Sequence, residues 1–194
     1  MNYKRLKYAC YATNISMSVV ATLSSLLFVT FRTMYGISYT LLGLLILINF
    51  VTQLSVDLIF SFFSHRFNIE KTVKLTPVLT IIGLCIYAIW PLCFPQAVYS
   101  GLVLGTIVFS ASAGLCEVLI SPVIASIPSD NPEREMSKLH SIYAWGVVFV
   151  VIFSSLFLLI FGRNHWCWLT IILTLVPLCA FLLFSGTKIP KMET

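Results

Sequence analysis

Long apolar runs separated by short polar segments dominate the pattern along this chain. Each run is close to the roughly 20 residues that a helix needs to cross a bilayer. The runs cover residues 10–31, 37–60, 75–94, 97–127, 141–161 and 166–184. The pattern therefore predicts an all-α, polytopic membrane protein in which residues 1–194 form a single bundle of six transmembrane helices.

The composition narrows the class of protein. Apolar residues make up 59% of the chain and charged residues 10%, whereas soluble domains carry about 25% charged residues. A soluble fold of this size exposes too much of its surface to hide so many apolar side chains. A soluble enzyme, a nucleic-acid-binding module and a disordered chain are therefore excluded, and the lipid bilayer is the expected surrounding.

The basic residues are distributed unevenly between the two sides of the predicted bundle. An even number of spans places both termini on one side, and ten of the twelve Lys and Arg residues fall on that side. These ten are Lys4, Arg5, Lys7, Arg66, Lys71, Lys74, Arg134, Lys138, Lys188 and Lys191. Only Arg32 and Arg163 fall on the other side. The positive-inside rule then predicts cytoplasmic termini in a plasma or inner cell membrane. The bias also explains the net charge of +5 without a nucleic-acid partner.

The second apolar run carries a polar stripe. Asn49, Gln53, Asp57 and Ser61 follow one another at a spacing of four, which keeps them near one side of a helix. Polar groups of this kind do not face lipid without cost. One interpretation is hydrogen bonding to other helices. The other is a gating face near the cytoplasmic mouth, formed by Gln53 and Asp57.

Glu117 is the only acid inside the fourth apolar run. Gly114 and Ser121 share its helical face, and Pro122 removes one backbone hydrogen bond close by. An ionisable residue within a membrane span is by default a site hypothesis. We expect Glu117 to bind a proton or a polar solute, the alternative being a structural acid bonded to a neighbouring helix.

Three further residues are candidates for the same site. Asn14 lies in the first run among hydroxyl residues, and we expect it in a polar cavity. His140 and Tyr143 open the fifth run just before Gly146. For Tyr143, as for Trp145, anchoring at the membrane interface is the alternative to a cavity role.

Signatures of other membrane functions are missing from the sequence. There is no His-Glu-x-x-His, Gly-x-Ser-Gly or Gly-x-Gly-Asp motif of an intramembrane protease, and no selectivity filter or Arg-rich voltage sensor. The three histidines have no metal-ligand spacing, so we expect neither a metal site nor a cofactor. Transport of a solute is the function that remains.

The loop between the second and third runs carries a family resemblance. Residues 61–71 fall where transporters of the major facilitator superfamily have a Gly-x-Leu-Ala-Asp-Arg-x-Gly-Arg loop. Arg66 matches that motif, while Ser61, His65 and Asn68 depart from it. The chain resembles the N-terminal, six-helix half of such a transporter. The resemblance implies a role for this loop, and so for Arg66, in gating.

A finer resemblance is to the fucose-permease branch of sugar transporters. Residues 117–122 are similar to a Glu-x-x-x-x-Pro segment of that branch, and residues 139–146 to the polar-aromatic-glycine start of the next helix. Residues 37–57 also look like the second helix of that branch. The resemblance implies an alternating-access carrier in which Glu117 carries the proton or contacts the sugar.

The expected function is therefore secondary transport, by proton-coupled uptake or exchange, of a small polar solute such as a sugar. Such carriers have about twelve helices in two halves, so the expected partner is a second six-helix half or a second copy of this chain. The alternative is a truncated or accessory membrane protein that does not transport by itself.

Overall fold

The computed structural model describes residues 3–190, and all regular structure in that range is helical. Eight α-helices follow one another along the chain. They are α1 (Tyr3–Leu26), α2 (Phe28–Tyr35), α3 (Tyr39–Phe63), α4 (Ile69–Cys93), α5 (Val98–Ala125), α6 (Pro132–Phe161), α7 (Trp166–Leu173) and α8 (Leu175–Phe184). Three 3-10 turns, η1 (Ser64–Arg66), η2 (Pro95–Ala97) and η3 (Arg163–His165), lie in the connections.

By length and apolar composition, the described helices can form the six membrane spans that the apolar pattern predicts, if the bent pair α1 and α2 counts as one span. Five spans are long and apolar enough on their own, and α1 with α2 makes a sixth that bends by 43°. The last of the five contains both α7 and α8, which meet at Thr174. Pro177 has no N–H to donate to the backbone one turn earlier, which accounts for the interruption.

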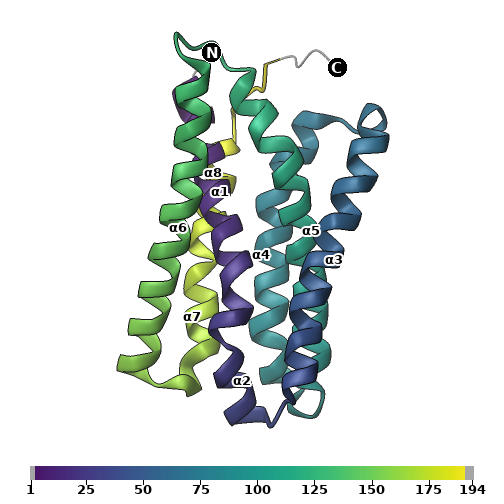
Figure 1. Ribbon diagram of the computed structural model, residues 1–194, viewed down its shortest axis with the longest axis vertical. Helices are drawn as coiled ribbons and strands as arrows, with labels where there is room; N and C mark the ends of the chain where they lie inside the picture. The colour runs from purple at the N-terminus through teal and green to yellow at the C-terminus, as the bar shows by residue number, and fades with distance from the viewer. Residues whose placement is uncertain (1–2, 191–194) are drawn as a thin grey trace.

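The spans run alternately up and down, so the chain returns to the same end after every second span (Figure 1). The α3–α4 and α5–α6 connections lie at the end where the described chain begins and finishes. Two side-chain contacts, one from α1 and one from α4, hold the last part of the described chain there. Arg5 donates to the carbonyl of Leu182 at 2.8 Å, and Lys74 donates to that of Thr187 at 2.6 Å. This is the basic end, predicted to be cytoplasmic; Lys191, one of its ten basic residues, lies outside the described range.

The helices begin earlier at this end than the apolar runs suggest. α4 starts at Ile69 rather than at 75, and α6 starts at Pro132 rather than at 141. Asparagine side chains cap both starts: Asn68 accepts from the Lys71 amide at 3.0 Å, and Asn131 accepts from the Arg134 amide at 2.9 Å. The apolar pattern marks only the part of each helix that lies in hydrocarbon, so it misses these polar first turns.

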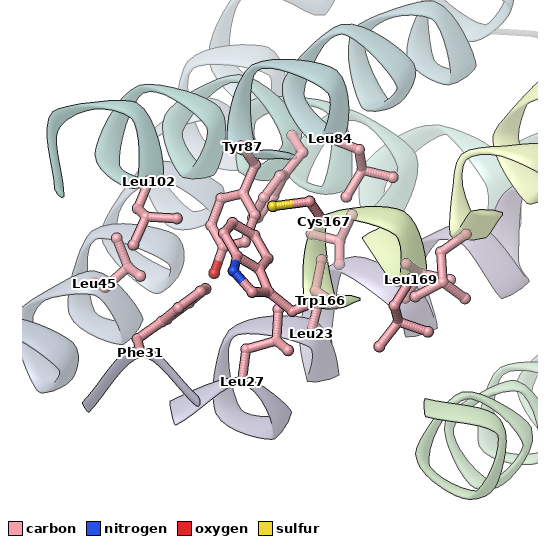
Figure 2. Close-up of a cluster of buried hydrophobic side chains, with 14 of the residues drawn as sticks. Leu23, Leu27, Phe31, Leu45, Leu84, Tyr87, Leu102, Trp166, Cys167 and Leu169 are labelled. Atoms are coloured by element: carbon pink, nitrogen blue, oxygen red, sulfur yellow. The ribbon is translucent and has the colours of Figure 1, made fainter. Parts of the chain in front are cut away.

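A cluster of buried aromatic and aliphatic side chains holds the opposite end together (Figure 2). The Trp166 ring packs edge-on against Phe31 at a centroid distance of 4.9 Å and against Tyr87 at 6.1 Å. The polar groups of both rings have hydrogen-bond partners. Trp166 Nε1 donates to the Tyr35 hydroxyl at 3.0 Å, and the Tyr87 hydroxyl bonds to the Ser24 hydroxyl at 3.2 Å. The first, third and last spans are thus locked together away from the basic end.

Close packing of α4 on α5 depends on small residues. A methyl group on Gly105 would lie 2.7 Å from the Tyr87 backbone nitrogen, and a methyl group on Gly101 would overlap the Trp90 ring. The Gly101-x-x-x-Gly105 segment therefore allows α4 and α5 to pack closely.

Candidate functional site: a polar cavity among four helices

A cavity of about 500 Å³ lies among α1, α3, α5 and α6. Its volume is within the range of small-molecule sites in proteins. Its lining is made up of Asn14, Met17, Ala21, Phe50, Gln53, Leu54, Asp57, Ala113, Cys116, Glu117, Ile120, Ser121, Leu139, His140 and Tyr143. Polar and apolar side chains therefore share the wall.

Six of the seven candidate residues from the sequence line this one cavity. They are Asn14, Gln53, Asp57, Glu117, His140 and Tyr143. Arg66 does not line it. Its side chain is exposed in η1, where the guanidinium lies 5.6 Å from the centre of the Phe63 ring.

The α1–α6 contact positions the candidates on both helices. Asn14 Nδ2 donates to the Leu139 carbonyl at 2.7 Å, and Ser18 donates to the Tyr143 carbonyl at 2.9 Å. A methyl group on Gly146 would lie 2.6 Å from the Ser18 hydroxyl, so the helices approach closely at this point. These contacts fix the register that places His140 and Tyr143 beside Asn14.

The α3–α5 contact positions the two acids. Asn49 Oδ1 accepts from the Ser110 hydroxyl and from Gln53 Nε2, both at 2.7 Å. A methyl group on Gly114 would lie 2.7 Å from the Gln53 carbonyl oxygen. The close approach of backbone at this level brings Asp57 of α3 and Glu117 of α5 to the same cavity.

The polar stripe of the second span divides between two roles. Asn49 is buried and bonds to α5, as the structural interpretation expects, whereas Gln53 and Asp57 line the cavity. Ser61 is exposed and does not line the cavity. A spacing of four residues advances 40° per step beyond a full turn, so by Ser61 the stripe has moved off the face that meets the other helices.

The charge of the lining is negative. Asp57 and Glu117 are carboxylates, and none of the described lining residues is a lysine or an arginine. Within residues 3–190, neither acid has a hydrogen-bond or ion-pair partner, and neither does His140. Glu117 and His140 are exposed, so the cavity opens to the surface of this chain.

No protein-family profile matches the sequence, and no curated protein matches it. The fold does have solved relatives. The chain is similar to the proton:xylose symporter XylE bound to 6-bromo-6-deoxy-D-glucose, with a TM-score of 0.81 at 14% identity. It is equally similar, with the same score and identity, to an inward-open conformation of the xylose transporter XylE from E. coli. This is the six-helix half of the major facilitator fold.

The half-fold assignment rests on the extent of these matches. Each covers 95% of this chain but only 44% and 48% of the two XylE chains, so this chain spans less than half of their length. The matches support the superfamily fold and give no support to the fucose-permease branch in particular.

An ion-pair cluster ties two helices of the half-fold together at its basic end. Glu135 of α6 accepts from the Tyr11 hydroxyl at 3.0 Å and pairs with Lys7 at 3.2 Å, both on α1. Lys138 pairs with the other carboxylate oxygen at 3.0 Å. Sequence reasoning missed this cluster, because Glu135 looks like any acid in the first turn of a helix.

The apolar part of the cavity wall was also missed. Met17 and Ala21 lie three and seven residues after Asn14, and Phe50 and Leu54 lie seven and three residues before Asp57. These spacings put side chains on one helical face. The signal was therefore present: the same-face neighbours of each polar candidate form the rest of the wall.

Proposed function

We propose that this chain is one half of a secondary carrier that couples the movement of a small polar solute across the membrane to that of protons, by uptake or exchange. The observation that carries the proposal is the cavity of about 500 Å³ in which two carboxylates face the same space without partners in the described chain. The fold shared with a proton:xylose symporter and with an inward-open xylose transporter supports it.

Glu117 lies deep within its membrane span, which indicates a functional role for its side chain. It lies eight residues before the end of α5, or about 12 Å along the helix axis at 1.5 Å per residue. An unpaired charge at such a depth is costly in lipid. Glu117 therefore needs water, a proton, a solute or a partner chain at the cavity, and a carrier supplies all four.

The proposed roles follow from position in the cavity. Glu117 takes up the proton. Asn14, His140 and Tyr143 face it from α1 and α6 and contact the solute. Asp57 and Gln53 lie within three turns of the basic end of α3 and belong to the gate, together with Arg66 in the loop beyond them.

The cavity needs a second wall. Of the five unbroken spans, α3 and α6 are the least buried and α5 is the most buried. Large apolar side chains cover the exposed faces of α3 and α6. We propose that a second six-helix half, or a second copy of this chain, packs against these faces, since halves related by an axis along the membrane normal can pair in this way. The resulting carrier would work in the plasma or inner membrane.

The second candidate function is that of an accessory or truncated membrane protein. The chain matches less than half of each XylE chain, and one wall of a cavity cannot alternate its access alone. An accessory or truncated membrane protein would share the fold and leave the acids without a transport role.

Uptake into proteoliposomes tests the proposal. The protein is purified in mild detergent so that bound partners are retained, and a pH gradient drives uptake of radiolabelled D-xylose or an amine. We expect accumulation that Glu117→Gln reduces at least tenfold and that Glu133→Gln, an exposed acid outside the cavity, leaves unchanged. Equal gradient-driven uptake by the wild type and Glu117→Gln would remove the proton role.

A further inference from the structure

We infer that the cavity takes an organic cation, an amine with an apolar body, in preference to a sugar or an anion. This inference rests on the proposed carrier function and deepens it by naming the solute class. It departs from the sugars named for the solved neighbours, a proton:xylose symporter bound to 6-bromo-6-deoxy-D-glucose and a xylose transporter, because the chemistry of this lining differs from what a polyol requires.

Charge is the first argument. Asp57 and Glu117 are the acidic side chains of the described lining, which includes no lysine or arginine and has His140 as its one basic side chain. In a cavity bounded by membrane-spanning helices, charges are poorly screened, so two free carboxylates repel an anion and attract a cation. Protons satisfy the same requirement, and an ammonium group competes with them for the carboxylates.

Hydrogen-bonding capacity is the second and independent argument. Asn14 is only 7% exposed, and its amide nitrogen already donates to the Leu139 carbonyl. The amide nitrogen of Gln53 donates to Asn49 in the same way. The carbonyl oxygens of both amides have no hydrogen-bond partner within residues 3–190. These two oxygens and the acids Asp57 and Glu117 are acceptors for the N–H groups of an ammonium. The donors of the wall are Ser121, His140, Tyr143 and the second N–H of each amide.

The apolar wall is the third argument. Met17, Leu54 and Ile120 contribute aliphatic surface, while Phe50 and Tyr143 contribute aromatic rings. Aromatic faces attract cations, and aliphatic side chains hold a hydrocarbon body. A polyol would leave this half of the wall without polar contacts. An amine with a small apolar group uses both halves.

Three ligands of one shape and different charge test the inference. Benzylamine, benzyl alcohol and benzoate are titrated calorimetrically at neutral pH into the full chain in lipid nanodiscs. We expect benzylamine, which is then a cation, to bind at least tenfold more tightly than benzyl alcohol, and benzoate to bind least. Asp57→Asn and Glu117→Gln should each reduce the ratio between amine and alcohol, and Glu133→Gln should preserve it.

Equal affinity for the amine and the alcohol would overturn the inference, as would a preference that both acid variants leave unchanged. If the variants fail to fold, as judged by circular dichroism and gel filtration, the order of the three ligands on the wild type still decides. The binding experiment and the uptake experiment can fail independently of each other. Amine preference without uptake would contradict transport alone, and gradient-driven uptake of xylose without amine preference would contradict the cation inference alone.

Discussion

At the scale of single residues, the most informative property of the site is the lack of partners for its charged groups. The ion pairs of the described chain involve Glu70 and Glu135 near the basic end. Asp57 and Glu117 share the cavity, yet neither is neutralised by a neighbour in residues 3–190. Acids kept only for structure are usually paired or hydrogen-bonded when they lie within a membrane.

Removal of the Asp57 charge tests the gating role. Asp57→Asn keeps the size of the side chain and leaves the Gln53–Asn49 hydrogen bond in place. We expect the transport rate per folded molecule to fall by about tenfold, the effect of roughly 1.4 kcal/mol on a barrier, while the yield of folded protein changes little. Initial uptake rates normalised to folded protein measure this. Reduced yield with unchanged turnover per molecule would make Asp57 a structural residue.

Loss of a single hydroxyl tests whether Tyr143 contacts solute. Its backbone carbonyl, not its hydroxyl, accepts the Ser18 bond that joins α6 to α1. Tyr143→Phe should therefore weaken solute binding by about 2- to 13-fold, the worth of one ordinary hydrogen bond, without lowering the melting temperature. Tyr8→Phe, at an exposed position on α1 outside the cavity, is the matched control. Unchanged affinity in Tyr143→Phe would assign Tyr143 to interface anchoring.

At the scale of helices, close backbone approach holds the cavity in shape more than hydrogen bonds do. Polar contacts between membrane helices are worth on average about 0.6 kcal/mol, which sets the value of the Ser110–Asn49 bond. Overpacking a tight contact costs about 1–3 kcal/mol. Gly114 therefore matters more to the position of the acids than the hydroxyls do, and Gly146 matters in the same way to the position of His140 and Tyr143.

A pair of glycine substitutions tests this ranking. Gly114→Ala places a methyl group 2.7 Å from the Gln53 carbonyl oxygen, so α3 and α5 must separate. We expect the free energy of unfolding to fall by about 1–3 kcal/mol. Gly43→Ala, on the same α3 helix but with no atom within 4 Å of the added methyl group, should be neutral or stabilising by up to about 1 kcal/mol. Reversible unfolding in mixed micelles measures both. Equal effects at the two positions would contradict close packing at Gly114.

The helices themselves could be predicted from the sequence, but the contacts between them could not. A run of about 20 apolar residues has a direct physical meaning in a bilayer, so all six spans were found. The bend between α1 and α2 and the interruption at Thr174 were not expected, because the apolar pattern continues through both. The pattern also cannot show which glycine meets a neighbouring backbone.

The same physical rule identified most of the polar residues that line the cavity, but it could not show which of them bond to another helix instead. Polar residues in membrane spans avoid lipid, so Asn14, Asp57 and Glu117 were expected to face inward, and they line one cavity. Asn49 could not be separated from them in advance, because its partner Ser110 comes from another span. Arg66 was selected through a loop motif rather than through this rule, and it lies away from the cavity.

At the scale of the whole molecule, the bundle is held together at both ends, and its cavity opens to the surface between them. The aromatic cluster around Trp166 closes one end of the bundle, and the Glu135 cluster ties α1 to α6 at the other. Between them, the cavity opens to the surface of the described chain through the exposed Glu117 and His140. A six-helix half with this shape is suited to sharing its cavity with a second half.

Thiol labelling tests directly whether access to the cavity alternates between the two sides of the membrane, and it does not require the solute to be known. Ala21 lines the cavity near the middle of the first span and is exposed. Ala21→Cys is made in a version that lacks the six native cysteines. A membrane-impermeant maleimide is then applied to intact cells and to inside-out vesicles. Asn164→Cys in η3 and Ser137→Cys in the first turns of α6 mark the two faces.

If access to the cavity alternates, we expect each marker to be labelled from one face only and Ala21→Cys to be labelled from both faces. Labelling of Ala21→Cys from a single face, with both markers behaving as expected, would contradict a carrier and leave the accessory membrane protein as the function of this chain.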